Sequence, residues 1–145
     1  MNQPAPGPSH PALNAMLICD NTIREEGTGK VSLIGIFEAI FAAQFPVRHG
    51  LLCVYAKVTD AEGDYEIKLE LVRLDDELTM GGGQARVTLA DRMAPAEFVF
   101  QLPNLGFERP GRYEFRLFAN GRWVGSKSFG VVLLQPPQAT AGGGG

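Results

Sequence analysis

The strongest constraint on the fold lies in the last third of the chain, where an Asn120–Gly121 pair separates two strand-like runs. Asn-Gly is the preferred pair for a two-residue type I′ hairpin turn, because both central residues of that turn need positive φ angles. Residues 112–119 and 122–134 therefore read as two antiparallel strands joined by this turn. The hairpin predicts an all-β, antiparallel protein.

Further strand-like runs, separated by turn residues, occupy the chain before this hairpin. They cover residues 16–20, 30–37, 51–59, 65–74, 84–90 and 96–102, with a short edge segment at 78–80 that ends at the glycines 81–83 and a loop at 103–106. Residues 30–37 are apolar on both sides, so we expect a central strand there, which bends at or after Gly35 and continues toward Phe41. Seven to nine strands with frequent turn signals predict an immunoglobulin-like β-sandwich, with a jelly roll or a C2-like sandwich as the alternative.

The two ends of the chain differ in composition from its body. Residues 1–12 hold four prolines, and residues 135–145 hold two prolines and four terminal glycines. Such segments favour extended, disordered tails, which leaves residues 13–134 as one β-sandwich domain. A chain of 145 residues is of ordinary size for a single domain.

Charge and hydropathy narrow the class of partner. The net charge of −3 has the wrong sign for a nucleic-acid surface. No apolar run approaches the roughly 18 residues that a membrane helix needs, and the N-terminal residues lack a signal-peptide pattern. The sequence therefore predicts a cytoplasmic protein with no membrane partner.

Two sets of short strings carry a resemblance to a known family. The first set is Leu17-Ile18-Cys19-Asp20, residues 28–37 (TGKVSLIGIF) and Phe45-Pro46, and the second is Leu105-Gly106-Phe107 with residues 110–115 (PGRYEF). Together they resemble a family of small bacterial single-domain proteins of unknown function, over most of residues 15–130. The resemblance implies a shared fold, but no activity and no site residues.

No catalytic motif is present in the sequence. Residues 27–32 (GTGKVS) resemble a phosphate-binding loop, but Arg24 and Val31 stand where that motif needs Gly and Ser or Thr, and a strand follows in place of a helix. The two cysteines, Cys19 and Cys53, sit in apolar runs, and neither they nor His49 show metal-ligand spacing. We expect no enzyme activity and no cofactor.

Two acidic turns offer a weak alternative, which is binding of calcium or a small ligand at the loop end of the sandwich. Their carboxylates belong to Asp60, Glu62 and Asp64 in one turn and to Asp75, Asp76 and Glu77 in the other. Solvated hairpin tips explain these acids equally well.

The hairpin offers the main candidate site. A two-residue turn pairs Phe118 with Trp123 and places both on the face opposite to Tyr113, together with Arg116. If the Tyr113 face is the core, these three residues form an exposed aromatic–basic patch of the kind found at interaction hot spots. Loops could instead cover the patch, or a bulge could turn Trp123 inward. We therefore expect a non-catalytic module or subunit that binds a protein through this patch or through an edge strand; the oligomeric state is not predicted.

Overall fold

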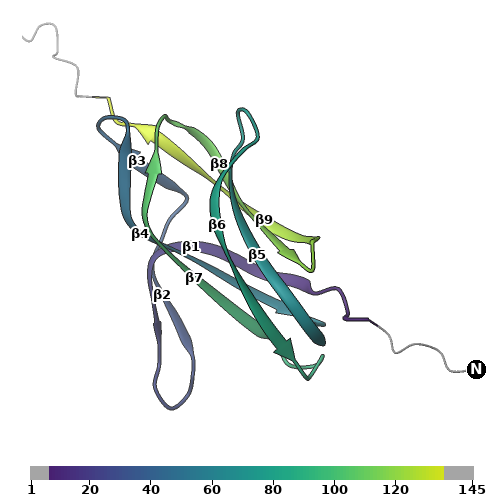
Figure 1. The fold of residues 1–145 in the computed structure, drawn as a ribbon. Helices are drawn as coiled ribbons and strands as arrows, with labels where there is room; N and C mark the ends of the chain where they lie inside the picture. The colour runs from purple at the N-terminus through teal and green to yellow at the C-terminus, as the bar shows by residue number, and fades with distance from the viewer. Residues whose placement is uncertain (1–6, 136–145) are drawn as a thin grey trace, which may run out of the picture.

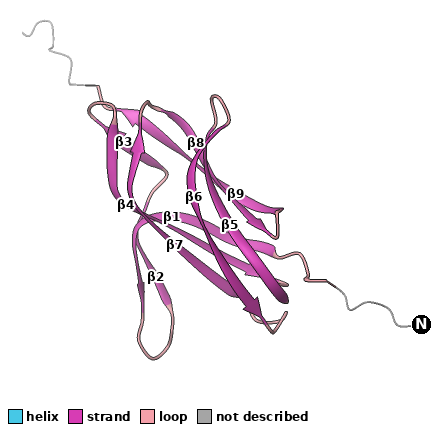
Figure 2. Ribbon diagram, in the orientation of Figure 1, coloured by secondary structure: helices cyan, strands magenta, loops and turns pink. Residues whose placement is uncertain are grey.

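The computed structural model describes residues 7–135, and within this range the chain forms nine β-strands and no helix (Figures 1 and 2). The strands are β1 (Ala12–Arg24), β2 (Val31–Ile36), β3 (Ala39–Ala42), β4 (Val47–Thr59), β5 (Gly63–Arg73), β6 (Leu78–Leu89), β7 (Ala96–Phe107), β8 (Gly111–Ala119) and β9 (Arg122–Leu133). They form a four-stranded sheet, β2-β1-β4-β7, and a five-stranded sheet, β3-β9-β8-β5-β6. The prediction of an all-β fold with seven to nine strands is confirmed.

The β8–β9 hairpin has the turn that the sequence predicts. Asn120 and Gly121 have φ angles of 52° and 78°, as a type I′ turn requires. Ala119 pairs with Arg122, and Phe118 pairs with Trp123. The Tyr113 hydroxyl donates a hydrogen bond of 2.6 Å to the backbone carbonyl of Arg109, four residues upstream.

The core lies between the two sheets and is centred on four aromatic rings from β7, β8 and β9. Phe107, Tyr113, Phe115 and Phe129 are each at most 1% exposed. Phe129 packs against all three of the others, with ring centroids 5.4 to 6.0 Å apart. On β5, every second residue completes this layer, namely Tyr65, Ile67, Leu69 and Leu71, as the clean alternation of that strand predicts.

The position of β2 differs from the prediction. β2 is an edge strand that pairs only with β1, on the side of β1 opposite to β4, and the pairing of β1 with β4 ends at Cys19 and Cys53. Residues 20–36 therefore form a hairpin, here called the β1–β2 arm, that extends beyond the two sheets in the view of Figure 1. The central placement is wrong because apolar side chains on both faces of a strand do not guarantee a covering layer. Ile34 and Ile36 are 45% and 53% exposed.

The chain bends after β2 and crosses to the other sheet. β3 pairs in parallel with the end of β9, with Ala39 next to Gly130. The prediction of one strand that bends at or after Gly35 and continues toward Phe41 is therefore wrong in part, because Ala39–Ala42 form a separate strand in the other sheet.

Two segments predicted as breaks are continuous strands. Gly81–Gly83 lie inside β6, where a carbon at the Cβ position of Gly82 would lie 1.8 Å from the carbonyl oxygen of Leu69, so only glycine allows this approach of the two backbones. Pro103 lies inside β7, which tolerates the missing amide because β7 is an edge strand.

The N-terminal segment begins to pack before the predicted domain boundary at residue 13. The Ser9 amide donates to the carbonyl of Glu62 at 3.2 Å, and the Tyr65 hydroxyl donates to the carbonyl of Ser9 at 2.6 Å. Pro11 is buried and β1 begins at Ala12. The remainder of the two predicted tails, residues 1–6 and 136–145, lies outside the described residues, and residue 135 follows β9 without secondary structure. The described residues contain no helix long and apolar enough to cross a membrane.

Candidate functional site

The candidate patch lies on the outer face of the five-stranded sheet, at the tip of the β8–β9 hairpin. The rings of Phe118 and Trp123 meet edge to face with their centroids 5.8 Å apart, and Trp123 is 49% exposed. Tyr113, Phe115 and Leu117 occupy the opposite, buried face of β8. The patch therefore presents an aromatic pair to solvent from a hairpin whose other face is fixed in the core.

A bulge does occur in this hairpin, but it does not turn Trp123 inward. Phe118 pairs with Trp123 and Leu117 pairs with Gly125, so Val124 is the extra residue. The irregularity thus lies beyond Trp123 as counted from the turn, and Trp123 stays on the face of Phe118. The alternative in which Trp123 belongs to the core does not hold.

Arg116 lies on the same face, but two carboxylates hold its guanidinium. Its Nε lies 2.7 Å from Oε2 of Glu114, and its Nη2 lies 2.9 Å from Oε2 of Glu77. The hydrogen bond to Glu114, and then the one to Glu77, raise the pKa of Arg116 above its usual value. Arg116 is therefore a neutralised and anchored cation at the edge of the patch. The sequence did not indicate that Glu77 and Glu114 both bind Arg116, because Glu77 belongs to the β5–β6 turn, which is distant in the sequence.

Charged side chains of β5 complete the border of the patch. In the sheet register, Lys68 lies opposite Phe118 and Glu70 lies opposite Arg116. The Nζ atom of Lys68 lies 3.1 Å from Oε1 of Glu70. An apolar centre with a polar rim is the usual anatomy of a protein-binding surface.

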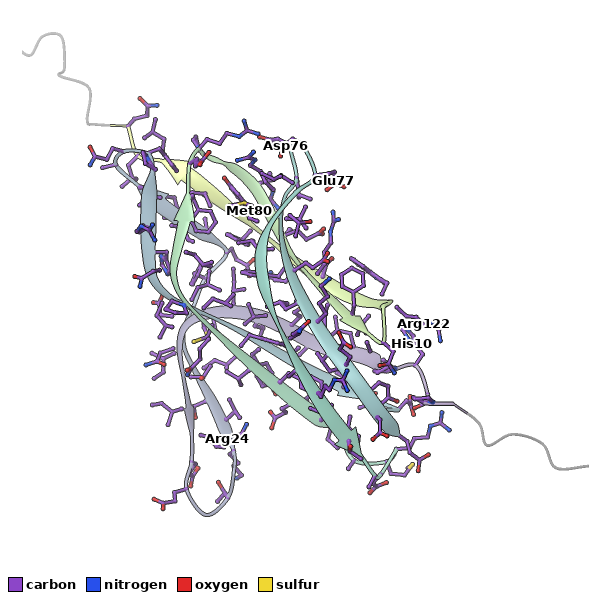
Figure 3. The ribbon with its side chains drawn as sticks, in the orientation of Figure 1. His10, Arg24, Asp76, Glu77, Met80 and Arg122 are labelled. Carbon is purple, nitrogen blue, oxygen red and sulfur yellow. The ribbon has the colours of Figure 1, made fainter. Side chains whose placement is uncertain are left out.

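The two acidic turns do not form one site. Asp60, Glu62 and Asp64 lie before or at the start of β5, whereas Asp75, Asp76 and Glu77 follow its end. The eleven residues of β5 separate the two groups by roughly 35 Å at about 3.3 Å per residue. Figure 3 places Asp76 and Glu77 at the end of the molecule far from Arg122, which marks the tip of the β8–β9 hairpin. The expectation that both acidic turns contribute to one site at the same end of the sandwich is therefore wrong.

Asp76 of the β5–β6 turn is paired with two arginines. Nη2 of Arg73 lies 2.7 Å from Oδ2 of Asp76, and Nη2 of Arg109 lies 3.4 Å from the same oxygen. The hydrogen bond from Arg73 lowers the pKa of Asp76 to about 2. These contacts fasten the turn to the loop that precedes Tyr113.

Asp64 at the other end of β5 lines a surface depression of about 440 Å³. Glu66, Arg86, Thr88 and Asn120 also line it, and the Thr88 hydroxyl donates to Oδ1 of Asp64 at 2.7 Å. No group of three or more His, Cys, Asp or Glu side chains suited to a metal ion occurs among residues 7–135.

The two cysteines lie opposite each other across the β1–β4 pair and are fully buried. Burial is the largest cause of the raised pKa of each thiol, so both stay protonated and are poor nucleophiles. The only histidine within the predicted domain is His49, whose ring packs near Phe37 and whose Nε2 lies 4.0 Å from a carboxylate oxygen of Asp20. The sequence could not show that the cysteines are neighbours, because 34 positions separate Cys19 from Cys53.

Comparison with known proteins gives a family and a fold. No curated protein matches the chain significantly. The C-terminal domain of wzt is similar in structure, with a TM-score of 0.52, 16% sequence identity, and coverage of 92% of this chain and 81% of that one. A beta-glucosidase from Listeria innocua in complex with glucose matches 67% of this chain and 15% of its own length, with 11% sequence identity and a TM-score of 0.41. Residues 14–132 match the model of a family of unknown function, DUF6941, and the chain belongs to that family.

Proposed function

We propose that this protein is a non-catalytic interaction module or subunit that binds a protein partner through the outer face of the β8–β9 hairpin. The observation that carries the proposal is the half-exposed Trp123, held edge-on against Phe118 on a hairpin whose other face is core. Trp, Tyr and Arg are enriched among the residues whose truncation costs most binding energy at protein interfaces. Trp and Tyr supply a large contact area there at small entropic cost.

The border of the patch supports a protein partner over a nucleic acid. Arg116 is neutralised by Glu77 and Glu114, and Lys68 by Glu70, so the patch presents no excess of positive charge. A nucleic-acid surface needs cations that are free to neutralise phosphates. We also propose that the protein and this partner are located in the cytoplasm.

Within the two-sheet architecture, we propose the immunoglobulin-like variant. Three features support it: the parallel pairing of the short β3 with the last strand β9, the placement of β8 between β9 and β5, and the Tyr113 hydroxyl bonded to the carbonyl four residues upstream. A tyrosine corner of this type marks the penultimate strand of immunoglobulin-like domains. A jelly roll or a C2-like sandwich remains the alternative.

Crosslinked capture of partners from native lysate tests the function, with wild-type protein compared with Trp123→Ala. We expect a specific protein to be captured by the wild type and lost by the variant, because the variant removes the aromatic anchor and leaves the fold intact. Phe41→Ala is the matched control, since Phe41 is an exposed aromatic residue (61%) on another strand of the same sheet.

The control should capture the partner as the wild type does, and all three proteins should melt at the same temperature. Equal capture by the wild type and Trp123→Ala would contradict the proposed surface. A much lower melting temperature of Trp123→Ala would contradict the half-exposed position of the indole on the outer face of the sheet.

The depression at Asp64 supports a second candidate, binding of a small polar ligand or of calcium at that end of the sandwich. Its lining offers carboxylate, guanidinium, hydroxyl and amide groups from Asp64, Arg86, Thr88 and Asn120. A calcium ion here would draw on the carboxylates of Asp64 and Glu66, since Asp60 and Glu62 do not line the depression. Calcium would then raise the melting temperature by mass action, whereas the protein-binding proposal predicts no such rise.

A further inference from the structure

Two cysteine thiols lie side by side next to the root of the β1–β2 arm, which comprises residues 20–22 and 34–36. Cys19 and Cys53 are directly opposite each other in the antiparallel β1–β4 pair, and both are 0% exposed. Directly opposed residues of antiparallel strands have Cα atoms about 4.5 to 5.5 Å apart, and their side chains point to the same face. A disulfide spans Cα distances of about 4.4 to 6.8 Å, so the backbone already holds the two residues at bridging distance.

The closeness of the two thiols is also visible in their acidity. Burial and then the neighbouring Cys53 raise the pKa of the Cys19 thiol. Burial raises the pKa of the Cys53 thiol as well, and hydrogen bonding with Thr22 offsets part of that rise. Both thiols are therefore protonated while they are covered, which protects the pair from oxidants in this arrangement.

The root of the arm contributes to the cover over the pair. The Cys19 thiol donates to the carbonyl oxygen of Asn21 at 3.3 Å, and the Cys53 thiol lies 3.9 Å from the carbonyl oxygen of Asp20. Both carbonyls belong to the arm, just beyond the last pairing of β1 with β4. Because that pairing ends at the cysteines, no β1–β4 ladder bond holds the arm to β4, and the root can open while the two sheets stay intact.

We propose that Cys19 and Cys53 are a redox site, which forms a reversible disulfide when the arm opens and a small disulfide oxidant such as oxidised glutathione reaches the thiols. The thiolate of one cysteine attacks a sulfur of the oxidant, which forms a mixed disulfide and releases one glutathione thiolate. The second cysteine thiolate then attacks the sulfur of the first cysteine and releases the other glutathione thiolate. The cysteine pair loses two electrons, the oxidant is reduced, and the two cysteine protons end on the two glutathione thiols.

The position of the pair favours completion of the bridge. Because the second thiol already lies opposite the first, the mixed disulfide has a resolving partner at bridging distance and does not accumulate. A reversible bridge also suits the proposed cytoplasmic location, since cytosolic disulfides are mostly transient or redox-sensing. The inference goes beyond the binding face at Trp123, because the two cysteines lie in the other sheet.

Oxidation of the folded protein with oxidised glutathione, followed by mass spectrometry without reductant, tests the bridge. We expect the wild type to lose the mass of two hydrogen atoms, to carry no glutathione, and to recover its original mass in dithiothreitol. The matched control is the double variant Cys53→Ala with Leu51→Cys, which moves the thiol two positions along the same face of β4. Its Cα atom then lies about 7 to 8 Å from that of Cys19, so the intramolecular bridge should form on the order of tenfold more slowly.

The oxidant concentration is set so that the urea-unfolded wild type becomes fully oxidised, and circular dichroism confirms that each variant is folded. A folded wild type that keeps both thiols free, or that carries glutathione in place of the bridge, would overturn the proposal. Bridging in the double variant at the wild-type rate or faster would overturn it as well, because the direct opposition of Cys19 and Cys53 would then have no effect.

Two glycines of the arm test whether its opening controls the reaction. A carbon added at Gly35, in the root, would lie 3.1 Å from Cβ of Asp20 and against its carboxylate, whereas a carbon added at Gly29, near the tip, meets no atom within 4 Å. The φ angles of 69° and 71° are nearly equal, so both alanine variants carry the same backbone strain. We expect Gly35→Ala to form the bridge on the order of tenfold faster than Gly29→Ala, because only the added contact at the root favours opening. Equal rates in the two variants would overturn the control of the site by the arm.

Discussion

Phe129→Ala should lower the free energy of unfolding by about 3 to 5 kcal/mol, the usual cost of truncating a fully buried phenylalanine. Phe129 is 1% exposed and contacts the rings of Phe107, Tyr113 and Phe115, so its removal leaves a cavity where the two sheets meet. Since domains of this size are stable by about 5 to 15 kcal/mol, the variant should lose a large part of its stability. Urea denaturation measures the change directly.

Val132→Ala is the control for this prediction. Val132 lies on the same strand but is 41% exposed, so its truncation should change the free energy of unfolding by no more than about 0.5 kcal/mol. If Phe129→Ala were as stable as Val132→Ala, the aromatic cluster would not be the centre of the core.

Gly82→Ala should be nearly as damaging, although it adds a single methyl group. Gly82 has a φ of 154°, a region that costs other residues about 1 to 3 kcal/mol, and its added carbon would lie 1.8 Å from the carbonyl oxygen of Leu69. β6 must therefore move away from β5 to accept the methyl group. We expect a total loss of about 3 kcal/mol or more, with faster amide exchange along the β5–β6 ladder.

Gly81→Ala is a closely matched control, because it lies one residue earlier in the same strand. A carbon added at Gly81 has no atom within 4 Å, and the φ of this residue is not in the positive region. Its stability should stay within about 0.5 kcal/mol of the wild type. Equal stability of the two alanine variants would contradict the close approach of β5 and β6.

Features that depend on local chemistry could be predicted from the sequence. The Asn120–Gly121 turn fixes the pairing of Phe118 with Trp123, because the turn type determines the register of the adjoining strands. The alternation of apolar and polar residues in 65–71 predicts the buried face of β5, because successive side chains of a strand point to opposite faces. The aromatic pair of the candidate patch follows from these two facts.

Features that depend on distant pairing could not be predicted in the same way. Residues 31–36 have the composition of a central strand, and they lie at an edge because, among the described residues, no strand pairs with the side of β2 that faces away from β1. The clamp of Arg116 by Glu77 joins residues 39 positions apart. In the sequence, the glycines of β6 look like a break in the strand. Glycine is needed at position 82 because the backbone of β5 approaches it closely, and the sequence does not show that contact.

The separation of the two acidic turns follows from the sequence alone. One strand of eleven residues lies between the turn that contains Asp60 and the turn that contains Asp76, so the two turns must lie at its opposite ends. Counting connections along the predicted strands would have excluded a shared site.

Fluorescence of Trp123 in the presence of the captured partner tests the central claim most directly, because Trp123 is the only tryptophan of the chain. In the free protein, the half-exposed indole should be accessible to acrylamide. With the partner bound, the account predicts a shift of the emission to shorter wavelength and a clear loss of quenching. Binding that leaves both the emission and the quenching of Trp123 unchanged would contradict the account, because the partner would then occupy another surface.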